Sequence, residues 1–422
     1  MNPSPGAAIP RFSARARTLQ RIDRVAGVPI CGLLTVARRI RDLFGRRPAE
    51  TPSRSILFLK LAEQGSTVLA HDAIRTAVAR VGRERVFFLV FEENRFILDA
   101  LGLIPPENVL TIRTRSFGSM VASVLRCLIE IRHRRIDACV DMEFFARASA
   151  AISFLTGAPR RVGFHTYFRE GPYRGDLLTH RVLYNPHLHT SRTFATLVRA
   201  LEIDPRVLPT FAFTPEPPAP SPLFRPAAEE MLAARCLLDE LGVPAEGRLV
   251  LLNANASDLL PLRRWEEGNY VALARRLLAE FPDLVVGFTG APEEESVIAR
   301  LVGQVGSPRC VCLAGRTTLR QLLALYGLAE VLVTNDSGPA HFAALTPIDV
   351  VALFGPETPL LFAAPGPRHH ALWAGLACSP CVNAFNNRQT ACRDNACMRA
   401  ITVDQVFATV GEIYRRRSGT RS

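Results

Sequence analysis

The strongest constraint on the fold is a recurring pattern of short apolar runs separated by longer amphipathic stretches. The runs that read as strands are residues 55–61, 85–91 and 137–141, and later 248–253, 284–289, 310–313, 331–334 and 350–354. Strands that alternate with helices form parallel sheets with helices on both faces. The pattern therefore predicts an α/β protein with doubly wound, Rossmann-like sheets.

The chain is long enough for two such units. It has 422 residues, and prolines crowd residues 204–226, where neither a helix nor a central strand is expected. The predicted organisation is a basic extension with an amphipathic helix (1–50), a first Rossmann-like domain (51–215), a linker (216–235), a second Rossmann-like domain (236–400) and a terminal helix (401–422).

Composition narrows the class of protein. Hydrophobic residues make up 48% and charged residues 21%, as in ordinary soluble domains, and no apolar run reaches the length of a membrane span. The ten cysteines include several isolated in apolar runs, which indicates a reducing cytoplasm. The net charge of +12 favours acidic partners, but no basic groove interleaved with aromatics is visible, so nucleic acid is not predicted.

Much of the positive charge lies in residues 1–50, which hold ten Arg against three acids. Residues 1–20 are expected to be disordered. Beyond them, apolar side chains recur at helical spacing, at Ile30, Leu33, Leu34, Ala37, Ile40 and Phe44. An Arg-rich helix with one apolar face is typical of peripheral attachment to an anionic membrane, and packing on the following domain is the alternative.

The stretch 331–341 is the clearest candidate site. An apolar run ends at Asn335-Asp336-Ser337-Gly338, and a helix is expected to begin at Pro339. Free backbone N–H groups at such a junction can seat a phosphate, and Gly338 lets a ligand approach the backbone. A capped turn with no ligand is the plainer interpretation.

Four segments resemble glycosyltransferase family 9, the lipopolysaccharide heptosyltransferase family with the GT-B fold. They are Thr-Asn-Asp-Ser-Gly-Pro-Ala-His at 334–341, Val-Ala-Leu-Phe-Gly-Pro-Glu-Thr-Pro at 351–359, Gly-Arg-Thr-Thr-Leu at 315–319 and Gly-Ala-Pro-Glu-Glu-Glu at 290–295. The resemblance implies two Rossmann-like domains facing a central cleft. Residues 51–215 would bind the acceptor and 236–400 the nucleotide-sugar donor, and the terminal helix would cross back to the first domain.

The resemblance also implies the donor site. Its candidates are Arg264 for the phosphates, Glu294 (or Glu293) for the ribose, and Asp336, Ser337, Gly338 and His341. No Asp-x-Asp metal motif occurs, so we expect the helix N-terminus and Arg263 or Arg264 to stabilise the leaving diphosphate, with no cofactor required.

The catalytic base is the point where the sequence departs from the family. Heptosyltransferases carry Asp after the glycine of the first loop, where this chain has Ser66 after Gly65. Serine is a poor base, so Glu143 and Glu63 are the candidates for proton removal. Ser66 would then bind a substrate.

Cys378, Cys381, Cys392 and Cys397 lie within twenty residues. Four thiols in a loop suggest a structural zinc or iron–sulfur site, with free or reversibly paired thiols as the alternative.

The sequence thus predicts an inverting, metal-independent glycosyltransferase, peripheral on the cytoplasmic face of the inner membrane. It would move a sugar, such as a heptose, from a nucleotide-sugar donor to a lipopolysaccharide or other lipid-linked acceptor. Among the donors, an ADP-sugar is the one that we expect. A non-catalytic nucleotide-sugar-binding homologue or scaffold at the membrane is the alternative, because of Ser66. A dehydrogenase is disfavoured, since no Gly-x-Gly-x-x-Gly follows the first strand of either domain.

Overall fold

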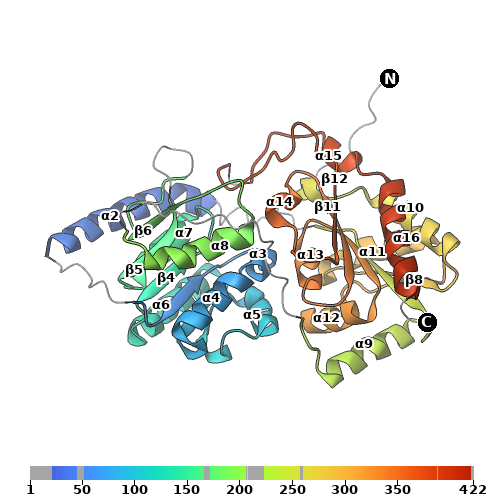
Figure 1. The fold of residues 1–422 in the computed structure, drawn as a ribbon, viewed down its shortest axis with the longest axis horizontal. Helices are drawn as coiled ribbons and strands as arrows, with labels where there is room; N and C mark the ends of the chain where they lie inside the picture. Colours follow the sequence, from blue (N-terminus) through green and yellow to red (C-terminus); the bar gives the residue numbers. More distant parts are fainter. Residues whose placement is uncertain are drawn as a thin grey trace.

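The computed structural model describes residues 21–44, 52–165, 172–205, 207, 223–256, 260–386 and 388–419. Two helix-and-sheet domains lie side by side, the first coloured blue to green and the second yellow to red (Figure 1). The prediction of disorder over 1–20 falls outside the described residues, as do residues 208–222 of the proline-rich stretch 204–226.

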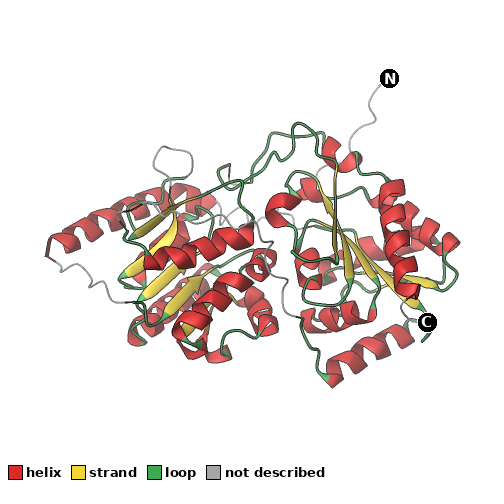
Figure 2. Ribbon diagram, viewed as in Figure 1, coloured by secondary structure: helices red, strands yellow, loops and turns green. Residues whose placement is uncertain are grey.

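Each domain is built on one parallel sheet of six strands, seen in yellow in Figure 2. The first sheet runs in the order β3 (Val109–Ile112), β2 (Val86–Phe91), β1 (Ile56–Leu59), β4 (Ala138–Asp141), β5 (Arg160–His165) and β6 (His180–Leu183). The second runs in the order β12 (His369–Trp373), β11 (Asp349–Phe354), β10 (Val331–Asn335), β7 (Arg248–Asn253), β8 (Leu284–Phe288) and β9 (Cys310–Cys312). This is the doubly wound Rossmann order in both cases, which confirms the predicted fold.

Helices cover both faces of the first sheet. Side chains of α4 (His71–Val81), α5 (Arg95–Leu101) and α8 (Thr190–Arg199) pack with Phe58 and Phe88 on one face. On the other, α6 (Phe117–His133) and α7 (Arg147–Leu155) pack with Leu57 and Leu89. The short helix α3 (Gln64–Leu69) follows β1. Alternate residues of each strand thus enter different cores, as the two-residue period of a strand requires.

The N-terminal helix α2 (Gly27–Phe44) packs against α7 through Cys31 and Leu34. Leu33 and Ile40, which share the apolar stripe predicted from the sequence, are instead exposed. The packed side and the exposed side are therefore both apolar in part, so packing and membrane attachment do not exclude one another. No helix among the described residues has the length and apolar content needed to cross a bilayer.

The helices of the second domain are α9 (Ala228–Glu240), α10 (Glu267–Glu280), α11 (Glu295–Val305), α12 (Leu319–Leu328), α13 (Gly338–Ala343), α14 (Pro359–Phe362), α15 (Ala396–Arg399) and α16 (Val403–Gly419). Helix α9 packs on α12, so the linker predicted over 216–235 ends before residue 228.

The terminal helix corrects one expectation. Helix α16 packs on α10 and on strands β10 and β11, with Val406, Val410 and Ile413 buried in that core. It lies on the far side of the second domain from the first (Figure 1). The expectation that it crosses back to the first domain is wrong, because its apolar face is already covered by the second.

Apolar packing continues from one domain into the other. Helix α3 packs on α13, and the rings of Phe96 and Phe342 meet edge to face at 6.3 Å. Both sheets reverse their strand order beside a central pair, β1 and β4 in the first and β7 and β10 in the second. Ligands of doubly wound sheets bind at the carboxyl ends of the strands at such a reversal.

We predict that α16 stabilises the second domain. Ile413→Ala removes a buried side chain and should lower the unfolding free energy by about 2–5 kcal/mol. Glu412→Ala, on the exposed side of the same helix, is the matched control and should change it by less than about 0.5 kcal/mol. Urea denaturation measures both, and equal effects would contradict the assignment.

Candidate active site

The loop after β1 and the loop after β4 meet at the carboxyl edge of the first sheet. The Lys60 ammonium, fully buried, lies 3.1 Å from a Glu143 oxygen and 3.3 Å from a Glu63 oxygen. Burial opposes the charge on Lys60, but Glu143 and Glu63 raise its pKa above the ordinary value. A buried cation therefore links the two glutamates predicted as candidate bases.

Glu143 is fully engaged by its own domain. One carboxylate oxygen accepts hydrogen bonds from the Leu61 N–H at 2.7 Å and the Ala62 N–H at 3.1 Å, and the other meets Lys60. This arrangement fixes the loop after β1. Glu143 is therefore better suited to holding the loop than to accepting a proton.

Glu63 lies at the mouth of the same loop, with its side chain a quarter exposed. Its backbone adopts a left-handed conformation (φ 66°), which turns the chain into α3. The Ser66 hydroxyl donates to the Glu63 carbonyl at 2.9 Å and lies 3.4 Å from its carboxylate. The Ser66 hydroxyl thus lies beside the Glu63 carboxylate.

The corresponding edge of the second sheet carries Asp336, at the end of β10. The Arg263 guanidinium lies 3.6 Å from the Asp336 carboxylate and forms an ion pair with Glu357. Both acids are almost fully buried. Burial raises the pKa of Glu357, and the neighbouring Asp336 carboxylate raises it further, against the pull of Arg263 and Arg388.

Helix α13 begins at Gly338, one residue before the expected Pro339, and Ser337 precedes it. The Ser337 hydroxyl donates to the Asn335 carbonyl at 3.2 Å and does not cap the helix. Because α13 has only six residues, its dipole is small, and the nearby arginines are the main source of positive charge.

His341 brings the two domains into contact. A methyl group added at Gly65 would lie 2.4 Å from the His341 ring, so only glycine fits there. Burial and the charges of Arg263 and the neighbouring His189 lower the pKa of His341 to about 4. His341 is therefore neutral near pH 7, with ring nitrogens able to donate or accept.

Arg388 bridges the domains. Its guanidinium pairs with Glu63 of the first domain and lies 3.3 Å from Glu357 of the second. Its loop is held across the interface by Phe385, whose ring stacks on Phe145 at 5.5 Å. Burial opposes ionised Glu63, but Arg388 and Lys60 together lower the pKa of its carboxyl to about 2. The bridge therefore joins the candidate base to the candidate donor site.

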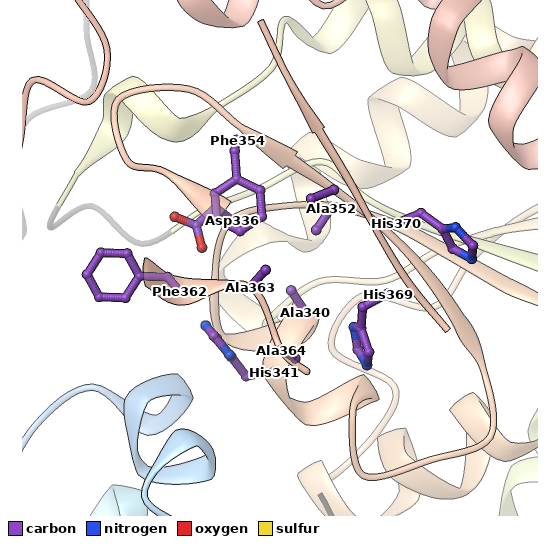
Figure 3. Close-up of a pocket in the computed structure, with 11 residues that line it drawn as sticks. Asp336, Ala340, His341, Ala352, Phe354, Phe362, Ala363, Ala364, His369 and His370 are labelled. Atoms are coloured by element: carbon purple, nitrogen blue, oxygen red, sulfur yellow. The ribbon is translucent and has the colours of Figure 1, made fainter. Parts of the chain in front are cut away.

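Several buried polar atoms at this junction make no hydrogen bond to any described residue. They are Arg263 Nε, Asp336 Oδ2, His341 Nδ1 and Glu357 Oε1. Asp336 and His341 also line a small pocket with Phe362 and His369, in which the Asp336 carboxylate and the His341 ring lie on either side of Phe362 (Figure 3). Arg263 Nε faces Asp336 Oδ2 at 3.6 Å and Glu357 Oε1 faces Arg388 at 3.3 Å, so these charges are paired but their hydrogen-bonding capacity is not filled. Buried polar groups that lack hydrogen bonds are costly, so this cluster is suited to a polar ligand.

Two predicted donor residues have local partners. The Arg264 guanidinium donates to the Ala256 carbonyl at 2.7 Å, and Arg263 is the residue that faces Asp336. The Glu294 carboxylate accepts from the Ala291 N–H at 2.8 Å and caps a helical turn, whereas Glu293 is exposed. Their contacts with donor remain predictions.

The four clustered cysteines are all free thiols, with Cys378 exposed and Cys397 buried. Among the described residues, no three His, Cys, Asp or Glu side chains converge in a way that could hold a metal ion. The structural zinc or iron–sulfur site at Cys378, Cys381, Cys392 and Cys397 stays a prediction.

Comparison with known proteins decides the family. The model of glycosyltransferase family 9 (heptosyltransferase) matches residues 124–391. The chain belongs to glycosyltransferase family 9. This confirms the resemblance seen in the sequence.

The curated relatives are similar over part of their length. Lipopolysaccharide heptosyltransferase 2 of Salmonella typhimurium is 31% identical over 143 residues, which cover 33% of this chain and 40% of the relative. The Escherichia coli K12 protein of the same name is 36% identical over 101 residues, covering 24% and 29%. The matched segment thus spans well under two thirds of either relative.

The fold is similar over most of the chain. ADP-heptose lipopolysaccharide heptosyltransferase II of Escherichia coli superposes with a TM-score of 0.66 at 19% identity, covering 86% of this chain and 99% of that one. A family 9 glycosyltransferase of Veillonella parvula gives 0.66 at 14% identity, covering 87% and 99%. These likenesses establish the GT-B architecture of this family 9 protein.

Three residues of the site were not singled out from the sequence of this family 9 member. Glu357 lies in the segment 351–359 that resembles the family, so it could have been identified as a site residue from the sequence. Lys60 ends an apolar strand, and Arg388 lies in the cysteine-bearing loop. Lys60 is three residues from Glu63, whereas only the folded chain brings Arg388 to it.

We predict that Gly65→Ala disturbs the domain contact. The added methyl group would collide with the buried His341 ring, so the variant should lose about 1–3 kcal/mol of stability. Gly118→Ala, on α6 with open space around it, is the matched control. Thermal unfolding compares the two, and an unchanged Gly65→Ala midpoint would contradict the close contact.

Proposed function

We propose that this family 9 protein is an inverting glycosyltransferase that moves a sugar from a nucleotide-sugar to a lipid-linked glycan. The observation that carries the proposal is the cluster of buried polar groups of Arg263, Asp336 and His341, each with an atom that makes no hydrogen bond to a described residue. Arg388 lies between this cluster and Glu63 of the other domain. Such a junction offers polar contacts to a donor beside a carboxylate that can take a proton.

The donor would bind at the edge of the second sheet. Departure of a nucleoside diphosphate leaves negative charge on phosphate oxygens, and fixed cations stabilise it. Arg263 and Arg388 both lie at the junction, and arginine suits bidentate phosphate contacts. Solved relatives are described with ADP-heptose or ADP, so an ADP-sugar, with heptose as the sugar, is the first donor to test.

The base would be Glu63. The acceptor oxygen attacks the anomeric carbon, the bond from that carbon to the diphosphate breaks, and the acceptor proton passes to Glu63. With a pKa of about 2 in the unliganded protein, Glu63 is ionised but weakly basic. Phosphates that draw Arg388 away would remove a cation from Glu63 and raise its pKa, so donor binding would strengthen the base.

Ser66 would orient this carboxylate through its hydroxyl, at 3.4 Å from Glu63. The same Ser66 favours the second candidate, a non-catalytic nucleotide-sugar-binding protein, because serine stands where relatives of the family carry Asp. Activity assays separate the two.

We further propose a peripheral position on the cytoplasmic face of the inner membrane, near a lipopolysaccharide-core or other lipid-linked acceptor. The support is the exposed apolar and basic side chains of α2.

One prediction of the proposed function concerns the donor. Among ADP-, GDP-, UDP- and dTDP-sugars, one nucleotide class should raise the melting temperature, by the equivalent of about 2.7 kcal/mol at a hundredfold excess over Kd. Asp336→Ala should abolish the shift, while Asp404→Ala, at an exposed position on α16, should keep it. No shift with any nucleotide would contradict the proposed donor site.

The second concerns the base. Glu63→Gln should lower kcat by about 10²–10⁴-fold and leave the donor-induced thermal shift intact. Glu143→Gln keeps a carbonyl oxygen for the Leu61 and Ala62 N–H groups and should retain more activity. If the wild type is inactive and the Ser66→Asp variant transfers sugar, the result would instead support the hypothesis of a non-catalytic protein.

A further inference from the structure

The exposed side of α2 and the turn before it is apolar. Val25, Leu33, Val36, Ile40 and Leu43 are between 53% and 81% exposed. Their spacing of three, four and eight residues places them along one side of the helix. A helix on a protein surface normally packs its apolar side chains against the core, whereas these side chains of α2 face the solvent.

The other side of α2 is fixed to the domain by specific contacts. The Asp23 carboxylate accepts from the Ala148 N–H at 2.7 Å, and the Thr35 hydroxyl accepts from the Asp176 N–H at 2.8 Å. Cys31 is fully buried between these contacts. The apolar stripe is therefore held outward by the packing of the opposite side.

Helix α6 carries a second exposed apolar row. Phe117, Val121, Leu125 and Ile129 recur every fourth residue and are between 41% and 70% exposed. Helix α7 packs beside α6 on the same face of the sheet, where the Arg132 guanidinium donates to the Leu155 carbonyl at 3.0 Å, and α2 packs on α7. The two apolar rows thus flank α7, and Figure 1 shows the three helices in one domain.

Charge selects the occupant of this surface. Exposed arginines accompany both rows, namely Arg21, Arg24, Arg39, Arg41, Arg126 and Arg132. The neighbouring acids are already engaged: Asp23 holds α7, Asp42 pairs with Arg38 at 3.0 Å, and Glu130 pairs with Arg134 at 2.6 Å. A second copy of this chain would bring arginine rows against one another, whereas anionic lipid headgroups would neutralise them.

We propose that the apolar rows of α2 and α6, with their arginines, form one docking surface for an anionic bilayer. It would bury the apolar side chains at the headgroup boundary, as interfacial helices do. The docking surface deepens the proposed function and rests on it, since a lipid-linked acceptor requires the enzyme to lie at the membrane. It consists of two apolar rows, where the sequence predicted a single stripe on one helix.

The surface also sets the orientation of the active site. The Asp23 carboxylate contacts the first turn of α7, and Phe117 is the first residue of α6. Both helices begin at the carboxyl edge of the sheet. The loop that carries Glu63 lies at that same edge. The docked protein would therefore hold the acceptor side of its cleft next to the membrane, where a lipid-linked glycan projects.

Co-sedimentation of the full chain with vesicles tests the surface. Binding to phosphatidylglycerol-containing vesicles should exceed binding to pure phosphatidylcholine vesicles and should fall as salt is raised. The triple change Leu33→Ser, Val36→Ser, Ile40→Ser and the double change Leu125→Ser, Ile129→Ser should each lower the partition coefficient at least about tenfold. Leu232→Ser, at an exposed apolar position on α9, is the matched control.

Two results would overturn the docking surface. One is unchanged vesicle binding in both multiple variants, and the other is a dimer in sedimentation velocity that the triple variant abolishes. The donor-induced thermal shift should persist in every variant. If the wild type shows no donor-induced thermal shift, the proposed function is contradicted. Failure of the docking surface and failure of the proposed function are therefore distinguishable.

Discussion

A chain of buried and partly buried opposite charges runs from one sheet to the other and links the two domains. Lys60, Glu63, Arg388, Glu357 and Arg263 follow one another across the interface, each beside a group of opposite sign. A buried charge is tolerated only when it is paired, and loss of one partner leaves its neighbour uncompensated. The cluster therefore links the two domains and brings together the groups to which we assign the chemistry.

Topology explains why the charges meet there. Each sheet reverses its strand order at a central pair of strands, and the loops after β1, β4 and β10 lie at those reversals. The central strands are covered on both faces and carry mostly apolar side chains, and polar residues such as Asp141 and Asn335 stand at their carboxyl ends. The carboxyl edges are where Glu63, Glu143 and Asp336 can be both fixed and reachable.

The fold could be predicted because alternating apolar runs leave few ways to bury a parallel sheet. Glu63, Ser66, Asp336 and His341 could also be selected from the sequence, since each lies within a few residues of the end of an apolar strand. Arg388 was not, because its partner Glu63 lies 325 residues away and the pairing needs both domains. Helical periodicity likewise identified α2 but not which side packs, since Cys31 and Thr35, on the buried side, are no more apolar than the exposed Leu33.

The position of Arg388 has a thermodynamic consequence. A group that ties the domains together and also offers itself to a ligand makes domain separation and ligand occupancy parts of one linked equilibrium. Any anion that competes for this guanidinium loosens the tie, and any substitution that loosens the tie changes the apparent affinity for the anion. If Arg388 contacts the donor as proposed, the measured affinity would also report how firmly the two domains are held together.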